Sequence, residues 1–316
     1  MDKKVLVCIP VYKAQRFKLL DYIAENPIDG VDYYYITQEN DNKKDVYADR
    51  YKQYPHMHEY CCVAKNIQEK RYAFYNHFIK EDYDYMIMLD DDILPRSQYI
   101  DGTLTSTKNS YKCKRCEINK LFNELIKVAS DNPETGIFAF TRFGFLGNAG
   151  TLEVIKNKNI CFAQFILINL DVLRKHPNVN FTKNVMMMED IDFGYKAIAD
   201  GVPFAKICYM TFIPELSSTF GILGKKRSSL IYTEDNHFHD IQLINTYKKF
   251  GGALRINKKN QIVFTSKPSK YINVGLDHLR VPFKKSGFDK ELDAIVFSKP
   301  TVDEDICNKV FEYLKK

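Results

Sequence analysis

The feature that most constrains this chain is an apolar segment that runs directly into three aspartates. Residues 83–89 have the composition of a strand, and Asp90, Asp91 and Asp92 follow with no spacer. Three adjacent carboxylates repel one another unless solvent or a cation offsets their charge, so they belong at the end of a strand. Side-chain alternation along an extended chain predicts that Asp90 and Asp92 point to one side and Asp91 to the other.

Two carboxylates on one side of a strand end suit Mg²⁺ or Mn²⁺, which also take oxygen ligands from a substrate diphosphate. The alternative is an acidic turn that caps the following segment. An Asp-x-Asp pattern is common by chance, but here it follows the strongly apolar residues 86–89. The position therefore favours a metal site with Asp90 and Asp92 as ligands.

The N-terminal third alternates between strand and helix patterns. Residues 5–9 form a continuous apolar run that Pro10 closes, which is typical of a buried parallel strand. The next expected elements are a helix at 15–25, a strand at 31–37, a helix at 63–80 and the strand at 83–89. This order predicts an α/β fold with a doubly wound, mostly parallel sheet. Ligands bind beyond the carboxyl ends of the strands in such sheets, where Pro10 and the aspartates lie.

The rest of the chain continues the α/β pattern with two polar interruptions, at residues 97–114 and 216–229. Gly201 is expected to end a helix at 186–200. The other expected elements are strands at 136–145, 160–170 and 205–213, a hairpin at 255–265, and helices at 117–131, 237–250 and 303–316. We expect a catalytic domain over residues 1–251 and a basic C-terminal extension, residues 252–316, packed on it.

A second acidic cluster, Glu189-Asp190-Ile191-Asp192, lies at the start of an expected helix. The helix dipole stabilises carboxylates at this end, and capping accounts for one or two of them. Three carboxylates within four residues exceed that need. Asp190, or Glu189, is therefore a candidate general base that takes a proton from an acceptor hydroxyl.

A His-x-His pair, His237 and His239, opens the helix expected at 237–250. Neutral imidazole is a good metal ligand, although a pair of surface histidines is the more common outcome. Because the aspartates already indicate a metal site, we retain both histidines as candidate ligands.

A glycine-rich basic loop spans residues 221–227. Its glycines allow close approach of the backbone to phosphates, and Lys225 and Lys226 supply positive charge. The loop lacks the spacing of a P-loop. No GxGxxG follows the first strand, which argues against a nicotinamide dehydrogenase, and Pro10-Val-Tyr12 is not the phosphate loop that a nucleotidyltransferase needs there.

Positive charge is concentrated in the C-terminal third. The chain has 46 Lys and Arg against 40 Asp and Glu, and residues 220–290 alone hold 14 basic and 5 acidic side chains. The remainder is net negative. This distribution favours a polyanionic partner such as a diphosphate, a nucleic acid or a membrane surface, and a solvated lysine-rich surface explains it equally well.

Targeting signals are not visible in the sequence. No secretory signal is apparent and no apolar run approaches the roughly 18 residues that span a bilayer. We expect a cytoplasmic location, the host's cytoplasm if the chain is viral, with the eight cysteines reduced. Cys113 and Cys116 form a CxxC that Cys61 and Cys62 would have to complete as a zinc site, and thiols outside any metal site are the better interpretation.

Several segments together resemble the family 2-like GT-A glycosyltransferases. Residues 5–12 resemble the opening strand that holds the nucleotide, and 88–92 resemble the Leu-Asp-x-Asp metal motif. Residues 70–76 are similar to the helix that touches base and diphosphate, and Glu189-Asp190 to the acceptor-site motif. The resemblance covers residues 3–250. It implies a nucleoside diphosphate sugar as donor and Mn²⁺ or Mg²⁺ as cofactor.

The resemblance also implies which residues contact the donor. They are expected to be Pro10, Tyr12, Gln38, Glu39, Arg71, Asp90, Lys225 and Lys226. The insertion at residues 97–116 is longer than a minimal member needs, and the downstream Trp or Arg pair of the acceptor helix is absent. Acceptor and stereochemistry are therefore left open.

Three interpretations of the function remain. The basic C-terminal region and the lack of a membrane segment look like the phage-type TET/JBP-associated glycosyltransferases, which modify hydroxymethylated pyrimidines in DNA. A saccharide or lipid-linked acceptor in glycan assembly is the first alternative. The second is a nucleic-acid-binding protein that has lost catalysis, which predicts salt-sensitive DNA binding without donor turnover.

Overall fold

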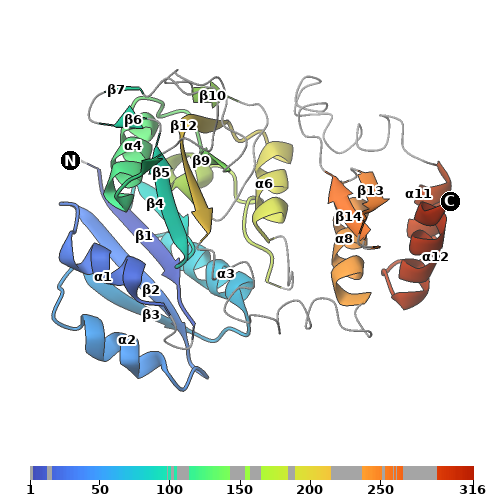
Figure 1. The fold of residues 1–316 in the computed structure, drawn as a ribbon, viewed down its shortest axis with the longest axis horizontal. Coiled ribbons are helices and arrows are strands. Elements are labelled where there is room, and N and C mark those ends of the chain that lie inside the picture. The colour runs from blue at the N-terminus through green and yellow to red at the C-terminus, as the bar shows by residue number, and fades with distance from the viewer. Residues whose placement is uncertain are drawn as a thin grey trace. The chain divides into compact units, whose positions relative to one another are not determined.

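The structure is a computed structural model that divides into two compact units (Figure 1). Unit 1 contains residues 1–184 and 189–219, and unit 2 contains 185–188 and 220–316. The expected boundary at residue 251 falls inside unit 2. The residues that the structure describes are 3–12, 16–97, 99–100, 103–104, 114–142, 154–156, 165–183, 189–214, 237–250, 253–258, 260, 262–265 and 290–316.

Unit 1 is built on a mixed ten-stranded sheet with the order β3-β2-β1-β4-β11-β9-β12-β5-β8, and β10 pairs with β12. Seven strands share one direction, and β5, β10 and β11 run the opposite way. The predicted α/β fold with a mostly parallel sheet is confirmed. The strands are β1 (Val5–Pro10), β2 (Val31–Gln38), β3 (Met57–Cys62), β4 (Tyr85–Leu89), β5 (Ile93–Ser97), β8 (Lys114–Arg115), β9 (Ile137–Arg142), β10 (Val154–Lys156), β11 (Phe165–Asn169) and β12 (Phe204–Pro214).

The strand order reverses at β1. The chain moves outward through β2 to β3 and then returns to place β4 on the other side of β1. Because successive connections leave β1 in opposite directions, the carboxyl ends of β1 and β4 form the switch point at which sheets of this kind bind their ligands. The fold thus places the end of the first strand, at Pro10, beside the aspartates that follow β4.

Helices cover both faces of this sheet. One face packs against α1 (Lys18–Glu25), α2 (Lys44–Tyr51) and α4 (Ile118–Ser130). The other packs against α3 (Ile67–Phe78), whose Tyr75 ring contacts Phe193 of α6 (Glu189–Ala199) at a centroid distance of 5.7 Å. The short helix α5 (Leu170–Leu173) follows β11. The two-sided covering is the reason why β1 is apolar at every position.

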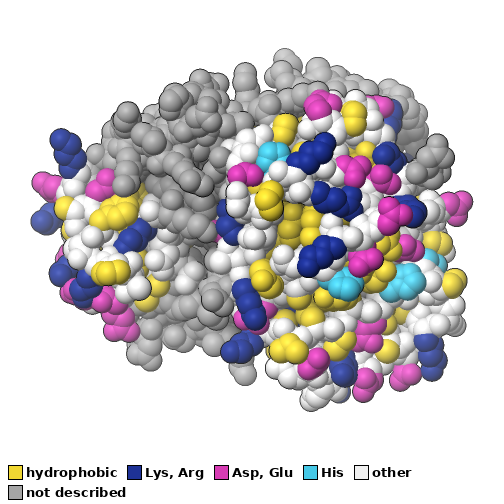
Figure 2. Space-filling model, turned by 180° about the vertical axis from the view of Figure 1, so that it is seen from behind, with side chains coloured by type: hydrophobic (Ala, Val, Ile, Leu, Met, Phe, Trp, Pro, Cys, Tyr) yellow, Lys and Arg dark blue, Asp and Glu magenta, His cyan; other side chains and the backbone are white. Residues whose placement is uncertain are grey.

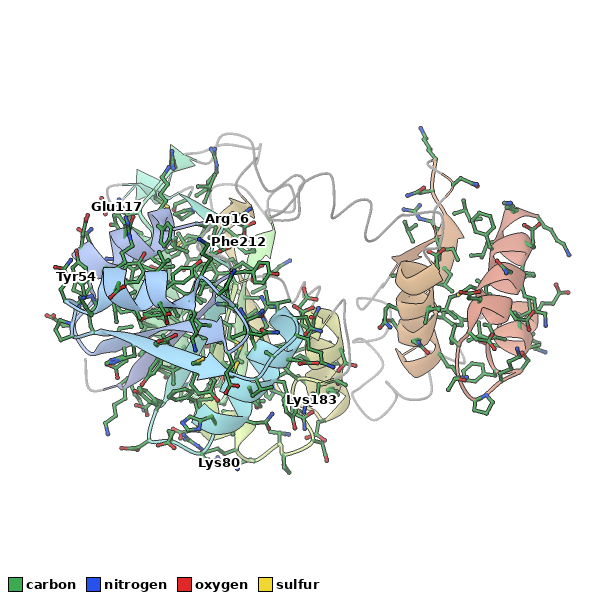
Figure 3. All side chains as sticks on the ribbon, turned by 90° about the horizontal axis from the view of Figure 1, so that it is seen from below. Arg16, Tyr54, Lys80, Glu117, Lys183 and Phe212 are labelled. Atoms are coloured by element: carbon green, nitrogen blue, oxygen red, sulfur yellow. The ribbon has the colours of Figure 1, made fainter. Side chains whose placement is uncertain are left out.

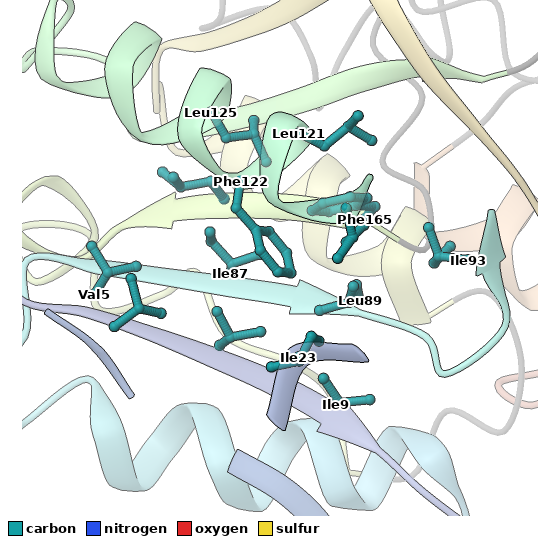
Figure 4. Close-up of a cluster of buried hydrophobic side chains, with 14 of the residues drawn as sticks. Val5, Ile9, Ile23, Ile87, Leu89, Ile93, Leu121, Phe122, Leu125 and Phe165 are labelled. Carbon is teal, nitrogen blue, oxygen red and sulfur yellow. The ribbon is translucent and has the colours of Figure 1, made fainter. Parts of the chain in front are cut away.

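The main core lies between the sheet and the first group of helices (Figure 4). Val5, Ile87 and Leu89 project from the strands toward Phe122 of α4, and all four are buried. The Phe122 ring meets the Phe165 ring of β11 edge to face at 5.7 Å. This core fixes β1 and β4 next to each other, which in turn fixes the loops at their ends.

Unit 2 has its own small core. Helix α8 (His237–Phe250) packs against the hairpin β13 (Ala253–Ile256)–β14 (Ile262–Thr265) and against α12 (Glu304–Lys315), which in turn packs against α11 (Lys290–Val296). The Tyr247 hydroxyl donates a hydrogen bond of 2.8 Å to Asp293, joining α8 to α11. The hairpin turns through Asn260, which has a φ of 59°. The predicted hairpin is confirmed.

The predicted end of α6 is also confirmed. Gly201 has a φ of 77°. Its N–H donates to the Ile198 carbonyl at 3.2 Å, and the Val202 N–H donates to the Ala197 carbonyl at 2.9 Å. These two bonds form a Schellman motif, in which glycine takes the left-handed position without steric cost.

Two further findings concern cysteines and membranes. None of the cysteines in the described residues forms a disulfide, and Cys8 and Cys208 are buried, as their apolar surroundings predict. Cys113 and Cys161 lie outside the described residues. Within the described helices, no segment is both long and apolar enough to cross a bilayer.

Candidate active site

The three aspartates lie where β4 ends and are held by two arginines. Asp90 accepts a hydrogen bond of 2.5 Å from Nη2 of Arg71. Arg16 Nη1 lies 3.3 Å from Asp91 Oδ1 and 2.9 Å from Asp92 Oδ2. The expected alternation, with Asp91 opposite Asp90 and Asp92, is wrong. The strand stops at Leu89 and the chain turns, so Asp91 and Asp92 share one partner.

Arg71 joins the two acidic clusters of the sequence. Arg71 is 5% exposed, and its other terminal nitrogen, Nη1, donates a hydrogen bond to Glu189 at the start of α6. Gln68, one turn earlier on α3, donates a 3.2 Å hydrogen bond to the second oxygen of Glu189. Burial alone would lower the pKa of Arg71, but the charges of Asp90, Glu189 and Asp190 raise it above its usual value. The guanidinium therefore stays charged.

The three carboxylates in the first turn of α6 have different surroundings. Glu189 is buried against Arg71. Asp192 accepts a 2.5 Å hydrogen bond from the Thr182 hydroxyl and lies 3.2 Å from the Lys196 ammonium, one turn along α6. Asp190 is partly exposed to solvent, and its charge acts on Arg71. Of the two expected base candidates, Glu189 is buried in the ion pair with Arg71, and Asp190 next to it is partly exposed.

Lys70 provides a buried positive charge at the end of β1. Lys70 is 2% exposed, and its ammonium donates a 2.5 Å hydrogen bond to the Val11 carbonyl. The ammonium also lies 5.7 Å from the centre of the Tyr12 ring. Desolvation lowers the pKa of Lys70, and Cys62 and then the carboxylates of Asp41 and Asp91 oppose that shift. The basic pair Lys70-Arg71 thus places one charge toward β1 and the other toward β4.

The end of β2 contributes polar groups beside β1. Pro10 pairs in register with Ile36, so the two strands end side by side. Gln38 is buried, and Glu39 is exposed with its N–H donating to the Cys62 carbonyl at 3.1 Å. The structure therefore gathers the expected donor residues of the first two strands at the same edge as Lys70.

Two contributors to the site were not identified from the sequence. Arg16 stands just before α1, and no motif marks it, because its partners are 75 and more residues away. Asp41 is 4% exposed and accepts a 3.0 Å hydrogen bond from the Lys43 N–H in the turn after β2. Lys70 falls within the segment that resembles the donor helix, and its position next to Arg71 was the available signal.

A cavity of about 520 Å³ opens beside Asp91 and Asp92 on the α1 and α4 side of the sheet. Its volume is in the range of small-molecule sites. The wall combines apolar and charged side chains of both signs. They are Lys18, Leu19, Tyr22, Asp91, Asp92, Ile93, Leu94, Pro95, Arg115, Cys116, Glu117, Ile118 and Lys120.

The residues at the end of β4 fit a divalent cation. Asp91 Oδ2 and Asp92 Oδ1 are buried and accept no hydrogen bond. Buried carboxylate oxygens without a partner are costly, and a hard cation supplies what they lack. Burial raises the pKa of Asp91 to about 7, against the opposing charge of Arg16. In the described part of the chain, no three His, Cys, Asp or Glu side chains are placed to chelate a metal. Substrate or solvent oxygens would have to complete the coordination.

Charge counting supports the same fit. Five carboxylates surround the strand end, from Asp90, Asp91, Asp92, Glu189 and Asp190. The side chains of Arg16, Lys70 and Arg71 supply three positive charges. With every group ionised, the metal-free site carries two excess negative charges, and this excess favours a cation.

Four expected site residues are not described at the side-chain level. His237 and His239 lie in α8 of unit 2, where only their backbone is described. Lys225 and Lys226 fall outside the described residues. Their roles stay predictions.

On the face of the molecule in Figure 2, blue Lys and Arg side chains are interspersed with magenta Asp and Glu side chains.

Comparison with known proteins identifies the fold. No protein-family model and no curated protein sequence matches the chain. A crystal structure of S. aureus TarS 1-349 matches with a TM-score of 0.50 and 10% identity, covering 99% of this chain and 90% of that one.

Two further TarS structures match less well. A structure of S. aureus TarS gives a TM-score of 0.46 and 12% identity, covering 77% of this chain and 43% of the other. One of TarS 1-349 in complex with UDP gives 0.45 and 11%, covering 78% and 72%. TarS is a glycosyltransferase of the GT-A type. The full-length match to TarS 1-349 shows that this chain has a GT-A-like fold.

Proposed function

We propose that this chain is a glycosyltransferase that uses a nucleoside diphosphate sugar and a divalent cation. One observation carries the proposal. At the switch point of a GT-A-like sheet, the buried cations Lys70 and Arg71 meet carboxylates that include two buried oxygens without hydrogen bonds, on Asp91 and Asp92. Such a mixture suits a ligand that brings both a diphosphate and a metal.

The donor residues follow from the strand ends. Pro10 and Tyr12 at the end of β1, with Gln38 and Glu39 at the end of β2, border the proposed place for the nucleotide. Lys70 supplies a positive charge there, and its ammonium has three donors, one of which is bonded to the Val11 carbonyl. A donor diphosphate is the kind of anion that would accept the others.

The cation is assigned to the end of β4. Asp90 and Asp92 are the proposed ligands, and Asp91 offers a further oxygen. When bound, a divalent cation offsets the negative charge that develops on the departing diphosphate. His237 or His239 is retained as a proposed additional ligand. Arg71 holds Asp90 in place through its 2.5 Å hydrogen bond.

Transfer forms one bond and breaks another. The acceptor hydroxyl oxygen attacks the anomeric carbon of the sugar, and the bond from that carbon to the diphosphate breaks with its electron pair on the diphosphate. In an inverting reaction Asp190 takes the hydroxyl proton. In a retaining reaction Asp190 instead supports the positive charge on the sugar ring. Arg71 fixes the start of α6 through Glu189 and so fixes the backbone that carries Asp190.

For the acceptor, we propose a hydroxymethylated pyrimidine, or a sugar on it, in phage DNA. The supporting observation is the excess of nine positive charges in residues 220–290, most of which lie outside the described residues. A saccharide or lipid-linked acceptor fits the site around Asp190 equally well. A catalytically inactive DNA-binding protein differs from both because it would turn over no donor.

The first test is a thermal-shift screen of UDP-, GDP- and dTDP-sugars with and without Mn²⁺. A ligand at 100 times its Kd stabilises the folded state by about 2.7 kcal/mol. The sugar that raises the melting temperature is then assayed for hydrolysis and transfer. If no nucleotide sugar stabilises the protein and none is hydrolysed, the glycosyltransferase proposal fails.

Asp190→Asn tests the proposed base. We expect transfer to an acceptor to fall by about 100-fold, the usual scale of general-base loss, while donor binding persists. Asp200→Asn is the matched control, because Asp200 follows α6 at its other end and contacts His176 at 2.9 Å. Full transfer activity in Asp190→Asn excludes Asp190 as the base. Loss of donor binding would assign it to the donor site.

The acceptor is tested separately by filter binding across a salt series, paired with labelled sugar transfer to hydroxymethylated and plain DNA. Contacts from the basic region to phosphates would release counterions, so affinity should fall steeply with salt. Absence of DNA binding at low salt would leave a saccharide or lipid-linked acceptor as the better assignment.

A further inference from the structure

Arg16 occupies an unusual position between two carboxylates. One of its nitrogens, Nη1, lies 3.3 Å from Asp91 Oδ1 and 2.9 Å from Asp92 Oδ2. The three side chains are largely shielded from solvent, with exposed fractions of 14% for Arg16, 8% for Asp91 and 11% for Asp92. Arg16, which is labelled in Figure 3, thus pairs with one proposed metal ligand, Asp92, and with Asp91, which offers the further oxygen.

The arrangement leaves the carboxylates incompletely satisfied. Arg16 contacts one oxygen of each, and the remaining oxygens, Asp91 Oδ2 and Asp92 Oδ1, are buried without a hydrogen bond. Because solvent does not reach those oxygens, a divalent cation does not reach them while the surrounding side chains keep this arrangement. The same two residues line the cavity of about 520 Å³, which offers a route of approach once the arrangement opens.

A divalent cation and the guanidinium do not fit this place together. Mg²⁺ and Mn²⁺ bind oxygens at about 2.1 Å. A cation bound to Asp91 and Asp92 would therefore lie within a few ångströms of Arg16 Nη1. Like charges at that distance in a shielded site repel strongly. This repulsion disfavours occupancy of the site by both cations at once.

We infer that Arg16 is a displaceable counter-ion, which neutralises Asp91 and Asp92 in the metal-free protein and moves away when a divalent cation binds them. This inference rests on the metal site of the proposed function. It assigns to Arg16 the control of metal affinity. It also means that Arg16 offsets the repulsion between the adjacent carboxylates in the folded, metal-free protein.

The test is a direct titration of metal-free protein with Mn²⁺, followed by calorimetry or by the paramagnetic signal of unbound Mn²⁺. Arg16→Met removes the competing cation, and we expect it to bind Mn²⁺ at least tenfold more tightly than the unchanged protein. Adding Asp92→Asn to Arg16→Met should abolish the gain. Arg16→Gln, which keeps a neutral hydrogen-bond donor, serves as the second variant if Arg16→Met does not fold.

Lys18→Met is the matched control for general electrostatics. Lys18 is exposed and lines the same cavity, so its removal takes one positive charge from the neighbourhood without touching the Arg16 contacts. We expect less than a threefold change in Mn²⁺ affinity. An equal gain in Lys18→Met and Arg16→Met would overturn displacement in favour of diffuse repulsion.

The remaining outcomes separate this inference from the proposed function. If Arg16→Met binds Mn²⁺ with unchanged or weaker affinity, Arg16 does not compete, and the proposed metal site still stands. If neither the unchanged protein nor any variant binds Mn²⁺, both the displacement and the metal part of the proposed function fail. A melting-temperature series gives a second readout, since Mn²⁺ should raise the melting temperature more in Arg16→Met than in the unchanged protein.

Discussion

Replacing Arg71 by methionine tests whether the buried ion-pair network holds the site together. The side chain of Arg71 is 6% exposed, and those of its partners Asp90 and Glu189 are 17% and 11% exposed. Removing one partner of a buried pair leaves uncompensated charge and costs roughly 3–5 kcal/mol. Because Arg71 serves two carboxylates that keep slight solvent contact, we expect a loss of about 3 kcal/mol in the free energy of unfolding.

The assay is urea unfolding followed by circular dichroism, with thermal unfolding alongside. A loss of about 3 kcal/mol corresponds to a fall of roughly 6–12 °C in melting temperature for a unit of this size. Arg71→Lys should fall between, since one ammonium cannot span both carboxylates. The control is Lys52→Met, which breaks an ion pair whose members are 73% and 78% exposed and should change stability by about 0.5 kcal/mol or less. An Arg71→Met loss as small as the control's would refute the network argument.

Three further predictions follow from particular contacts. The Asp21 carboxylate is partly buried, which raises its pKa, but hydrogen bonds from Arg50 and Tyr51 outweigh this and hold the pKa below 3.8. Asp21→Asn should therefore cost about 0.5–1 kcal/mol at pH 7, and the difference should vanish as the pH falls below 3.8 in urea unfolding. Gly136→Ala places a methyl group 2.5 Å from a Val202 methyl, so overpacking should lower the unfolding free energy by about 1–3 kcal/mol in the same assay. Lys70→Met should weaken nucleotide sugar binding at least tenfold by calorimetry while the fold is retained, and unchanged binding would remove Lys70 from the donor site.

The elements predicted correctly are those whose pattern is purely apolar or strictly periodic. In β1 each residue is buried, and α4 buries seven residues at helical spacing. Helix α2 and strand β3 were not predicted. Helix α2 buries only Tyr47 and Tyr51, while its one aliphatic residue larger than alanine, Val46, is exposed. Strand β3 carries His58 and Glu59 between its buried positions, so neither element shows a clear apolar period.

Strand β5 shows how tertiary context overrides a local rule. Residues 93–97 include Pro95, which argues against a strand interior because proline donates no hydrogen bond. Pro95 nevertheless pairs with Phe212 of β12, and the Cys116 N–H donates to its carbonyl at 3.2 Å. Helix α11 was missed because only Leu292 and Val296 are buried in its seven residues.

The candidate site was predictable in part. The sequence identified the two acidic clusters and the basic helix, since each is a local pattern. It did not reveal which charges meet, because Arg71 and Glu189 are 118 residues apart and Arg16 and Asp91 are 75 apart. It also misjudged the direction of Asp91. Alternation holds only while the chain is extended, and the strand ends one residue before the first aspartate.

The charge balance of the site constrains how a donor and a cation would bind. With every group ionised, the five carboxylates exceed Arg16, Lys70 and Arg71 by two charges, so a nucleoside diphosphate sugar alone would bring negative charge to a negative site. A divalent cation offsets that negative excess and so removes the repulsion. Coupling between two ligands is reciprocal, so Mn²⁺ should tighten donor binding by the same factor by which the donor tightens Mn²⁺ binding. If Arg16 moves away as the cation enters, its guanidinium is released just when the diphosphate needs positive charge. The internal counter-ion of the metal-free state then becomes available to the anion that accompanies the metal.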